Sequence, residues 1–244
     1  MTKERGEQEK RAVAEAAVRF VKTDMKLGLG SGSTSHHFIK LLGERVRKGE
    51  ISVEAVASSK ASEALARQVG IPLTEFRRGL HLDLAVDGAD EIATDLSLIK
   101  GGGGAHLREK VVAAAAAYFL VIGDSSKLVR QLGAFPVPAE VVPFAAPWVM
   151  DRIQEIGGDP VLRIDRASGE RCTTDQQNYI LDCQFGSIEQ PAQLASALEK
   201  IPGIVAHGIF IGYAQAAIVA QDSQVMLIRP GEAPRPLTDF RNLP

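Results

Sequence analysis

At residues 25–34 the chain reads Met-Lys-Leu-Gly-Leu-Gly-Ser-Gly-Ser-Thr, and this segment decides the fold. A short apolar run leads into alternating glycines, and hydroxyl residues follow where a helix is expected to begin, near Ser33. Glycine permits a tight turn, and the free N–H groups at the start of a helix can hold a phosphate. The segment therefore predicts a strand, a phosphate-sized turn and a helix.

The same alternation of strands and helices continues on both sides of this segment. Helical spacing of apolar residues predicts helices over 8–22 and 60–69 and a third that begins near 105 or 106. Apolar runs predict strands over 53–57, 82–86 and 119–123. Because alternating strands and helices connect by right-handed crossovers, we expect an α/β fold with a Rossmann-like, largely parallel sheet and helices on both faces.

A second, smaller unit is expected after residue 131. Three prolines fall within residues 135–143, and this change of composition is typical of a domain boundary. Beyond it, the patterns predict a small α+β unit, with helices over 148–156 and 191–200 and strands over 161–165 and 179–183. Apolar runs at 204–211, 217–220 and 225–228 can return to the first sheet. The expected division is 1–131 with 206–244 as the Rossmann-like domain and 132–205 as the small domain.

Composition limits the function classes. The 244 residues are 45% apolar, and 28 basic against 30 acidic side chains leave a net charge of −2, so no nucleic-acid or membrane-surface partner is expected. The longest apolar run, 111–122, is too short to cross a bilayer, and the N-terminal residues lack the apolar region of a signal peptide. Cys172 and Cys183 show no metal-ligand or disulfide spacing. We expect a cytoplasmic protein with reduced thiols.

The glycine turn itself is the first candidate binding element, with Ser31, Gly32, Ser33 and Thr34 at its helix end. A dinucleotide site favours a third glycine where Ser33 stands and an acidic residue after the second strand, where serines follow instead. A nucleoside triphosphate loop needs a lysine before its Ser/Thr, which this turn lacks. The turn is interpreted as a cradle for a simpler phosphate, with a purely structural glycine turn as the alternative.

Two further polar clusters follow apolar segments. One is Asp87-Gly88-Ala89-Asp90-Glu91, at the end of an expected strand, where ligands of open α/β sheets bind. Two nearby carboxylates can share one proton, so one can donate while the other accepts. The alternative is a solvated acidic turn in which Asp90 caps a helix.

The third cluster is residues 100–110, in which Lys100 and Glu109 flank a glycine loop that contains Gly101, Gly102 and Gly103. Successive N–H groups of such a loop can bind an anion, and Glu109 falls in the first turn of a helix, where a carboxylate is favoured. Proton abstraction and oxyanion stabilisation need these two kinds of group near one carbon. The alternative makes Lys100 a surface cation and Glu109 a stabilising first-turn acid.

In this order, the motifs closely resemble those of ribose-5-phosphate isomerase of the A type: GLGSGSTS at 28–35, SSKAS at 58–62, DGADEI at 87–92, KGGGGAHLREK at 100–110 and DSSKL at 124–128. The similarity spans nearly the whole chain. It implies reversible interconversion of ribose 5-phosphate and ribulose 5-phosphate in the pentose phosphate pathway, in the larger, catalytic domain. It also implies a reaction without metal or organic cofactor, a small sugar phosphate as binding partner, and a homodimer or homotetramer.

The resemblance also implies roles for individual residues. Glu109 would be the general base that moves a proton between C2 and C1 through an enediol(ate), and Lys100 would stabilise the developing negative charge. Asp87 with Asp90 would orient hydroxyls and assist ring opening. Substrate contacts would come from Ser31 to Thr34, Asp87 to Asp90, Lys100 to Gly103, and Lys127. The chain departs from the family's motifs at two positions. Ser31 stands where many family members carry threonine, and Gly104 stands where alanine is common. The extra glycine is expected to make the loop more mobile.

Three other functions are alternatives to this one. A metal-dependent isomerase is not expected, because adjacent His36 and His37 point in different directions on a helix and no further ligand spacing accompanies them. His106 is expected at a helix start facing solvent. A non-catalytic sugar-phosphate sensor of related fold is the main alternative, although no DNA-reading segment is evident. Acyl transfer with Glu109 as nucleophile is the third.

Overall fold

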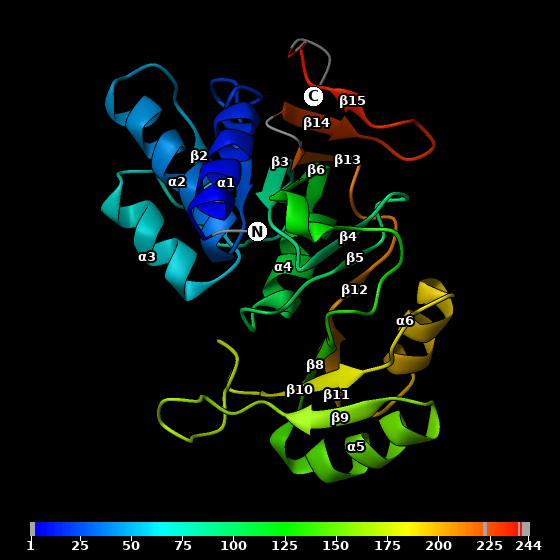
Figure 1. Ribbon diagram of the computed structural model, residues 1–244. Helices are drawn as coiled ribbons and strands as arrows, with labels where there is room; N and C mark the ends of the chain where they lie inside the picture. The colour runs from blue at the N-terminus through cyan, green and yellow to red at the C-terminus, as the bar shows by residue number, and fades with distance from the viewer. Residues whose placement is uncertain (1–2, 222–223, 239, 241–244) are drawn as a thin grey trace.

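The computed structural model describes residues 3–221, 224–238 and 240 (Figure 1). Its large sheet has the strand order β15-β14-β13-β6-β3-β1-β2. Neighbouring strands from β2 to β13 run parallel, and β14 and β15 are added antiparallel at one edge. The strand bounds are β1 Lys26–Leu29, β2 Glu54–Ala57, β3 Leu82–Asp87, β6 Ala116–Gly123, β13 Ala216–Gln221, β14 Gln224–Ile228 and β15 Arg235–Pro236.

Helices cover both faces of this sheet. Leu120 and Ile122 of β6 point into an apolar core shared with α1 (Lys3–Val18) and α2 (Gly32–Arg47). Their neighbours Phe119 and Val121 point to the other face, into a core that includes α4 (His106–Ala114). The continuous apolar run of β6 is therefore explained by burial on both sides, and the expected α/β fold class is confirmed. Helix α3 (Lys60–Gln68) packs beside α2 near β2.

The smaller unit is built on an antiparallel sheet in the order β11-β8-β10-β9. Figure 1 shows this sheet with its two helices at the opposite end of the molecule from β14 and β15. The elements are β8 Val137–Val141, η2 Pro143–Ala145, α5 Ala146–Glu155, β9 Asp159–Leu162, β10 Tyr179–Gln184, α6 Pro191–Glu199 and β11 Ile204–His207. Strand β11 joins β8 rather than the large sheet, so the expected return of 204–211 to the first sheet is wrong.

A third sheet, β12-β5-β4-β7, was not expected from the sequence. Its strands are β4 Glu91–Ala93, β5 Leu98–Ile99, β7 Leu128–Val129, which follows η1 (Ser125–Lys127), and β12 Ile209–Phe210. Strands of two or three residues are too short to show an alternating pattern. The β4–β5 pair is nevertheless important, because it is an antiparallel hairpin between the second and third polar clusters.

Several element limits differ from the expected ones. Helix α1 occupies 3–18 rather than 8–22, and α2 begins at Gly32 with Ser31 as its N-cap residue. The division into domains at residues 132 and 206 stays a prediction, and β11 crosses the second of these limits. In the described part of the chain, no helix is both long enough and apolar enough to span a membrane.

Candidate active site

A small cavity of about 110 Å³ lies where β1 and β3 end. Its lining combines the three polar clusters with Lys127, which the sequence places far from them. The lining residues are Ser31, Gly32, Ser33, Thr34, Gly88, Ala89, Asp90, Lys100, Gly101, Gly102, Gly103, Glu109 and Lys127. Thus the candidate substrate-contacting residues meet at one place, with Asp87 directly beneath them rather than in the lining.

Asp87 holds the ends of β1 and β3 together. Its Oδ1 accepts hydrogen bonds from Ser31 N at 2.8 Å, Gly88 N at 2.7 Å and Ser35 Oγ at 3.0 Å. The Ser35 hydroxyl, in the first turn of α2, thus contributes to holding Asp87. Asp87 is 4% exposed and fixes the turn from below.

The serine motif at 58–62 supports the same turn from the side. Ser62 Oγ donates to Gly30 O at 2.6 Å, and the Ser58 and Ser31 hydroxyls lie 2.8 Å apart. These contacts cross from the start of α3 to the turn after β1. The turn is thus held by β3 and α3 together, which leaves the N-terminus of α2 free to face the cavity.

The β4–β5 hairpin explains how Asp90 and Lys100 become neighbours. Glu91 pairs with Ile99 across the hairpin, and Asp90 N donates to Ile99 O at 2.8 Å. Lys100 N in turn donates to Gly208 O at 2.8 Å, on the segment that enters β12. The segment 90–100 therefore folds back on itself and delivers a carboxylate and an ammonium group to one cavity.

The ammonium group of Lys100 lies between two carboxylates. Its Nζ is 3.0 Å from Asp87 Oδ2 and 3.3 Å from Glu109 Oε2, and it donates to Gly88 O. Burial of this side chain, which is 2% exposed, disfavours the charged form. Attraction to Asp87 and Glu109 outweighs burial, so the pKa of Lys100 is raised above its usual range. Lys100 is a fixed positive charge in the cavity.

The pKa of Glu109 is also raised, but for a carboxyl group the rise favours the neutral form. Burial raises the pKa of this carboxyl to about 7, and the nearby Lys100 ammonium opposes that rise without cancelling it. Its side chain is 6% exposed, in the first turn of α4. A carboxylate with a pKa near neutrality can take up and release a proton at physiological pH. The Lys100–Glu109 pair therefore offers a base beside a cation.

The glycine loop 101–104 bends tightly around the cavity. Gly101 and Gly104 have φ angles of +101° and +76°, which side chains rarely adopt, and Gly104 N donates to Gly101 O at 2.9 Å. Gly102 N donates to Asp90 Oδ2 at 2.7 Å. The loop is thus tied to the hairpin that carries Asp90. Gly104 is therefore needed for the backbone conformation of the turn.

Comparisons with known proteins identify the family. The sequence model of the protein family "Ribose 5-phosphate isomerase A (phosphoriboisomerase A)" matches residues 54–224. The chain belongs to this isomerase A family. A relative named ribose-5-phosphate isomerase A from Parvibaculum lavamentivorans is 47% identical over 226 residues, covering 90% of this chain and 97% of the relative.

Solved structures of isomerase A proteins agree with this assignment. The one from Methanocaldococcus jannaschii has a TM-score of 0.88 and 40% identity, covering 92% of this chain and 99% of its own. A D-ribose-5-phosphate isomerase in complex with phospho-erythronic acid also has a TM-score of 0.88, with 37% identity and coverage of 91% and 98%. The resemblance inferred from the motifs is confirmed.

Two residues of this isomerase A chain differ from expectation. Glu91, part of the acidic cluster, faces away from the cavity and accepts from Gly133 N at 2.7 Å and Phe135 N at 2.6 Å. It anchors the Pro-rich junction instead. His106 does not face solvent: it is fully buried beneath Gly101, and burial lowers its pKa to about 3. Within the described ranges, no group of three His, Cys, Asp or Glu side chains is placed as metal ligands would be.

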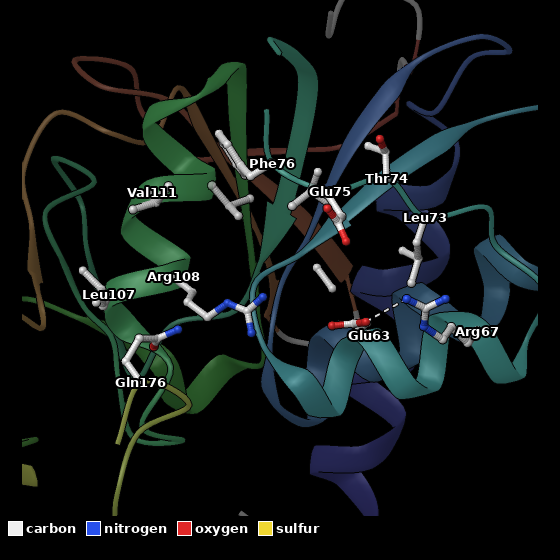
Figure 2. A pocket seen from close by; sticks show the side chains of 13 residues that line it. Glu63, Arg67, Leu73, Thr74, Glu75, Phe76, Leu107, Arg108, Val111 and Gln176 are labelled. Atoms are coloured by element: carbon white, nitrogen blue, oxygen red, sulfur yellow. Dashed lines mark hydrogen bonds and ion pairs between the residues drawn. The ribbon is translucent and has the colours of Figure 1, made fainter. Parts of the chain in front are cut away.

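A larger groove of about 660 Å³ lies between α3 and α4 (Figure 2). On the α3 side of the groove, Glu63 and Arg67 form an ion pair at 2.8 Å. On the α4 side, Arg108 forms an ion pair with Asp175 at 3.2 Å. Its remaining lining is mostly apolar and includes Leu73, Phe76, Leu107 and Val111. Volume alone would favour this groove as the active site, but the charged side chains that converge on one point line the smaller cavity.

Proposed function

We propose that this protein interconverts D-ribose 5-phosphate and D-ribulose 5-phosphate through an enediol(ate) intermediate. The observation that carries the proposal is the pair of Lys100 Nζ and Glu109 Oε2, 3.3 Å apart in one glycine-lined cavity. Membership of the isomerase A family supports it, as does a related structure in complex with phospho-erythronic acid, a sugar-acid phosphate.

Glu109 is proposed as the general base. Its carboxylate would remove the proton from C2 of the open-chain aldose and return it to C1. A hydroxyl proton passes from O2 to O1 in the same reaction, so the carbonyl group moves from C1 to C2. A pKa of about 7 suits this task, since the same group must accept and then release the proton. Lys100 would stabilise negative charge on the substrate oxygens, because its ammonium is fixed before the reaction begins.

The other cavity residues are proposed to bind and orient the sugar phosphate. Asp90 faces the cavity and would hold hydroxyls and assist ring opening. Asp87 would contribute through Lys100 and the Gly88–Ala89 backbone, because its own oxygens are taken up by hydrogen bonds and the ion pair. The N-terminus of α2, at residues 31–34, and Lys127 offer the positive potential that a phosphate needs. The proposed proton transfer needs no metal or organic cofactor.

One experiment separates this reaction from the sensor alternative. Purified protein is incubated with ribose 5-phosphate in deuterated water with excess chelator, and the products are examined by NMR. We expect ribulose 5-phosphate that carries solvent deuterium at C1. Binding of ribose 5-phosphate without any turnover would favour a sensor, and turnover lost to chelator but restored by a divalent cation would favour a metal-dependent mechanism.

We also infer a homodimer or homotetramer in the cytoplasm. Phe144 is 95% exposed and Trp148 is 52% exposed, both on the small unit, so they offer apolar area for contact between subunits. Cys172 and Cys183 are free cysteines, which fits a reducing compartment.

A further inference from the structure

Arg163, at the end of β9 in the small unit, reaches the glycine loop of the catalytic cavity. Its Nη1 donates to Gly101 O at 3.1 Å and to Gly102 O at 3.0 Å. The other side of the same guanidinium faces Asp182 on β10: Nε donates to Oδ2 at 2.8 Å, and Nη2 donates to Oδ1. One planar group thus contacts the small sheet and the loop at once, and its side chain is 15% exposed.

These contacts fix how two peptide groups of the loop are turned. The peptide between Gly101 and Gly102 has its C=O on Arg163 and its N–H on Asp90 Oδ2, at 2.7 Å. The next peptide also has its C=O, that of Gly102, on Arg163. In a trans peptide the N–H points opposite to the C=O, so the N–H of Gly103 is directed away from Arg163, as is that of Gly102. Gly102 and Gly103 both line the cavity.

We propose that Arg163 is a positioning residue for the reaction, which from outside the cavity directs the Gly103 N–H towards the substrate and keeps the Gly102 N–H on Asp90. This inference rests on the proposed function. Four successive glycines have many alternative conformations, and an oriented N–H donor requires that most of them be excluded. Arg163 excludes them with two hydrogen bonds, and Asp182 holds its guanidinium in the required plane.

The proposal also gives the small unit a part in catalysis. An arginine that served only to join β9 to β10 would need no more than its pair with Asp182. Here the remaining nitrogen, Nη1, leaves the small sheet and donates to two backbone carbonyls of the loop that follows Lys100. Lysine cannot reproduce this arrangement, since a single ammonium lacks the planar fork that holds a carboxylate and two carbonyls together.

The test compares Arg163→Gln and Arg163→Lys with Arg171→Gln. Arg171 is a matched control, because it is an exposed arginine of the same unit that donates to Tyr179 Oη rather than to the loop. Steady-state kinetics with ribose 5-phosphate give kcat and KM. Hydrogen exchange of the substrate-free protein, followed by mass spectrometry, reports on the backbone at 101–104 and, for comparison, at 137–141.

For Arg163→Gln we expect kcat to fall about 10- to 100-fold, the loss that a misplacement of about 1 Å can cause. Arg163→Lys should fold normally and lie between Arg163→Gln and the parent. Exchange at 101–104 should accelerate in both variants while 137–141 is unchanged, and Arg171→Gln should match the parent.

Parent-like kinetics and loop exchange in Arg163→Gln would overturn the proposal. If Arg163→Gln unfolds, the folded Arg163→Lys decides, and full activity with unchanged loop exchange overturns it. An inactive parent protein would instead refute the proposed reaction. Loop exchange, which needs no substrate, would still test the effect of Arg163 on the loop.

Discussion

Glu109 is subject to two opposing influences. The first turn of α4 favours a negative charge, by about 0.3–1 kcal/mol at exposed sites. Burial disfavours it, and the net result is a pKa raised to about 7. Burial therefore wins, even against the neighbouring Lys100. The residue is ready to exchange a proton at neutral pH while its partner stays charged.

Glu109→Gln should lower kcat by at least about 10³-fold, since the amide cannot accept a proton and the carboxylate provides the base. The side chain keeps its shape, so the affinity for phospho-erythronic acid should change much less. Steady-state kinetics measure kcat, and calorimetric titration measures the affinity for phospho-erythronic acid. Turnover within tenfold of the parent would show that the base lies elsewhere.

The rate should also depend on pH through this group. The base must be ionised, so kcat/KM is expected to rise tenfold per pH unit below about 7 and to level off above it. Lys100 has a raised pKa, so it remains protonated and should cause no decline between pH 7 and 9. A kcat/KM profile from pH 5 to 9 measures this. A rate that is flat from pH 5 to 7 would contradict the assignment.

At the scale of the elements, the site depends on close approach of the turn after β1 to the end of β3. A Cβ placed on Gly30 would lie 2.1 Å from Asp87 Oδ1 and 2.5 Å from Asp87 Cα, which no side-chain rotation of Asp87 fully relieves. Glycine is needed here because another backbone passes beside it. The glycine turn after β1 is thus a packing requirement as well as a proposed binding element.

Gly30→Ala should therefore destabilise the protein by about 1–3 kcal/mol, the usual cost of overpacking. Gly103→Ala is the matched control, since a Cβ there would have no atom of the described chain within 4 Å. Denaturant unfolding of both variants compares the two costs. Equal stability of the two would mean that the turn relaxes freely away from Asp87.

For the whole molecule, the assembly prediction concerns the exposed apolar side chains of the small unit. Replacing Phe144 and Trp148 by aspartate should convert the proposed oligomer to monomers, because buried charge at an apolar contact is costly. Light scattering after size exclusion gives the mass. Phe76→Asp, at a residue 46% exposed on the large unit, is the control and should leave the mass unchanged. Parent-like mass in the double variant would locate the interface elsewhere.

The sequence predicted the parts of this molecule that repeat a regular pattern. Strands such as β6 and the glycine motifs at strand ends were predictable, because burial and phosphate binding impose residue types at fixed spacing. The β4–β5 hairpin, which joins Asp90 to Lys100, was too short to show a period. The role of Glu91 and the contact of Arg163 with the loop depend on residues more than 40 positions apart, and no local pattern records such contacts.

The proposed reaction requires that Glu109 and Lys100 act on the same end of one sugar phosphate. A crystal structure of the protein with phospho-erythronic acid tests it most directly. We predict that the Glu109 carboxylate and the Lys100 ammonium both lie within about 3.5 Å of the non-phosphorylated end of the ligand. A ligand bound with that end beyond the reach of both groups would contradict the claim.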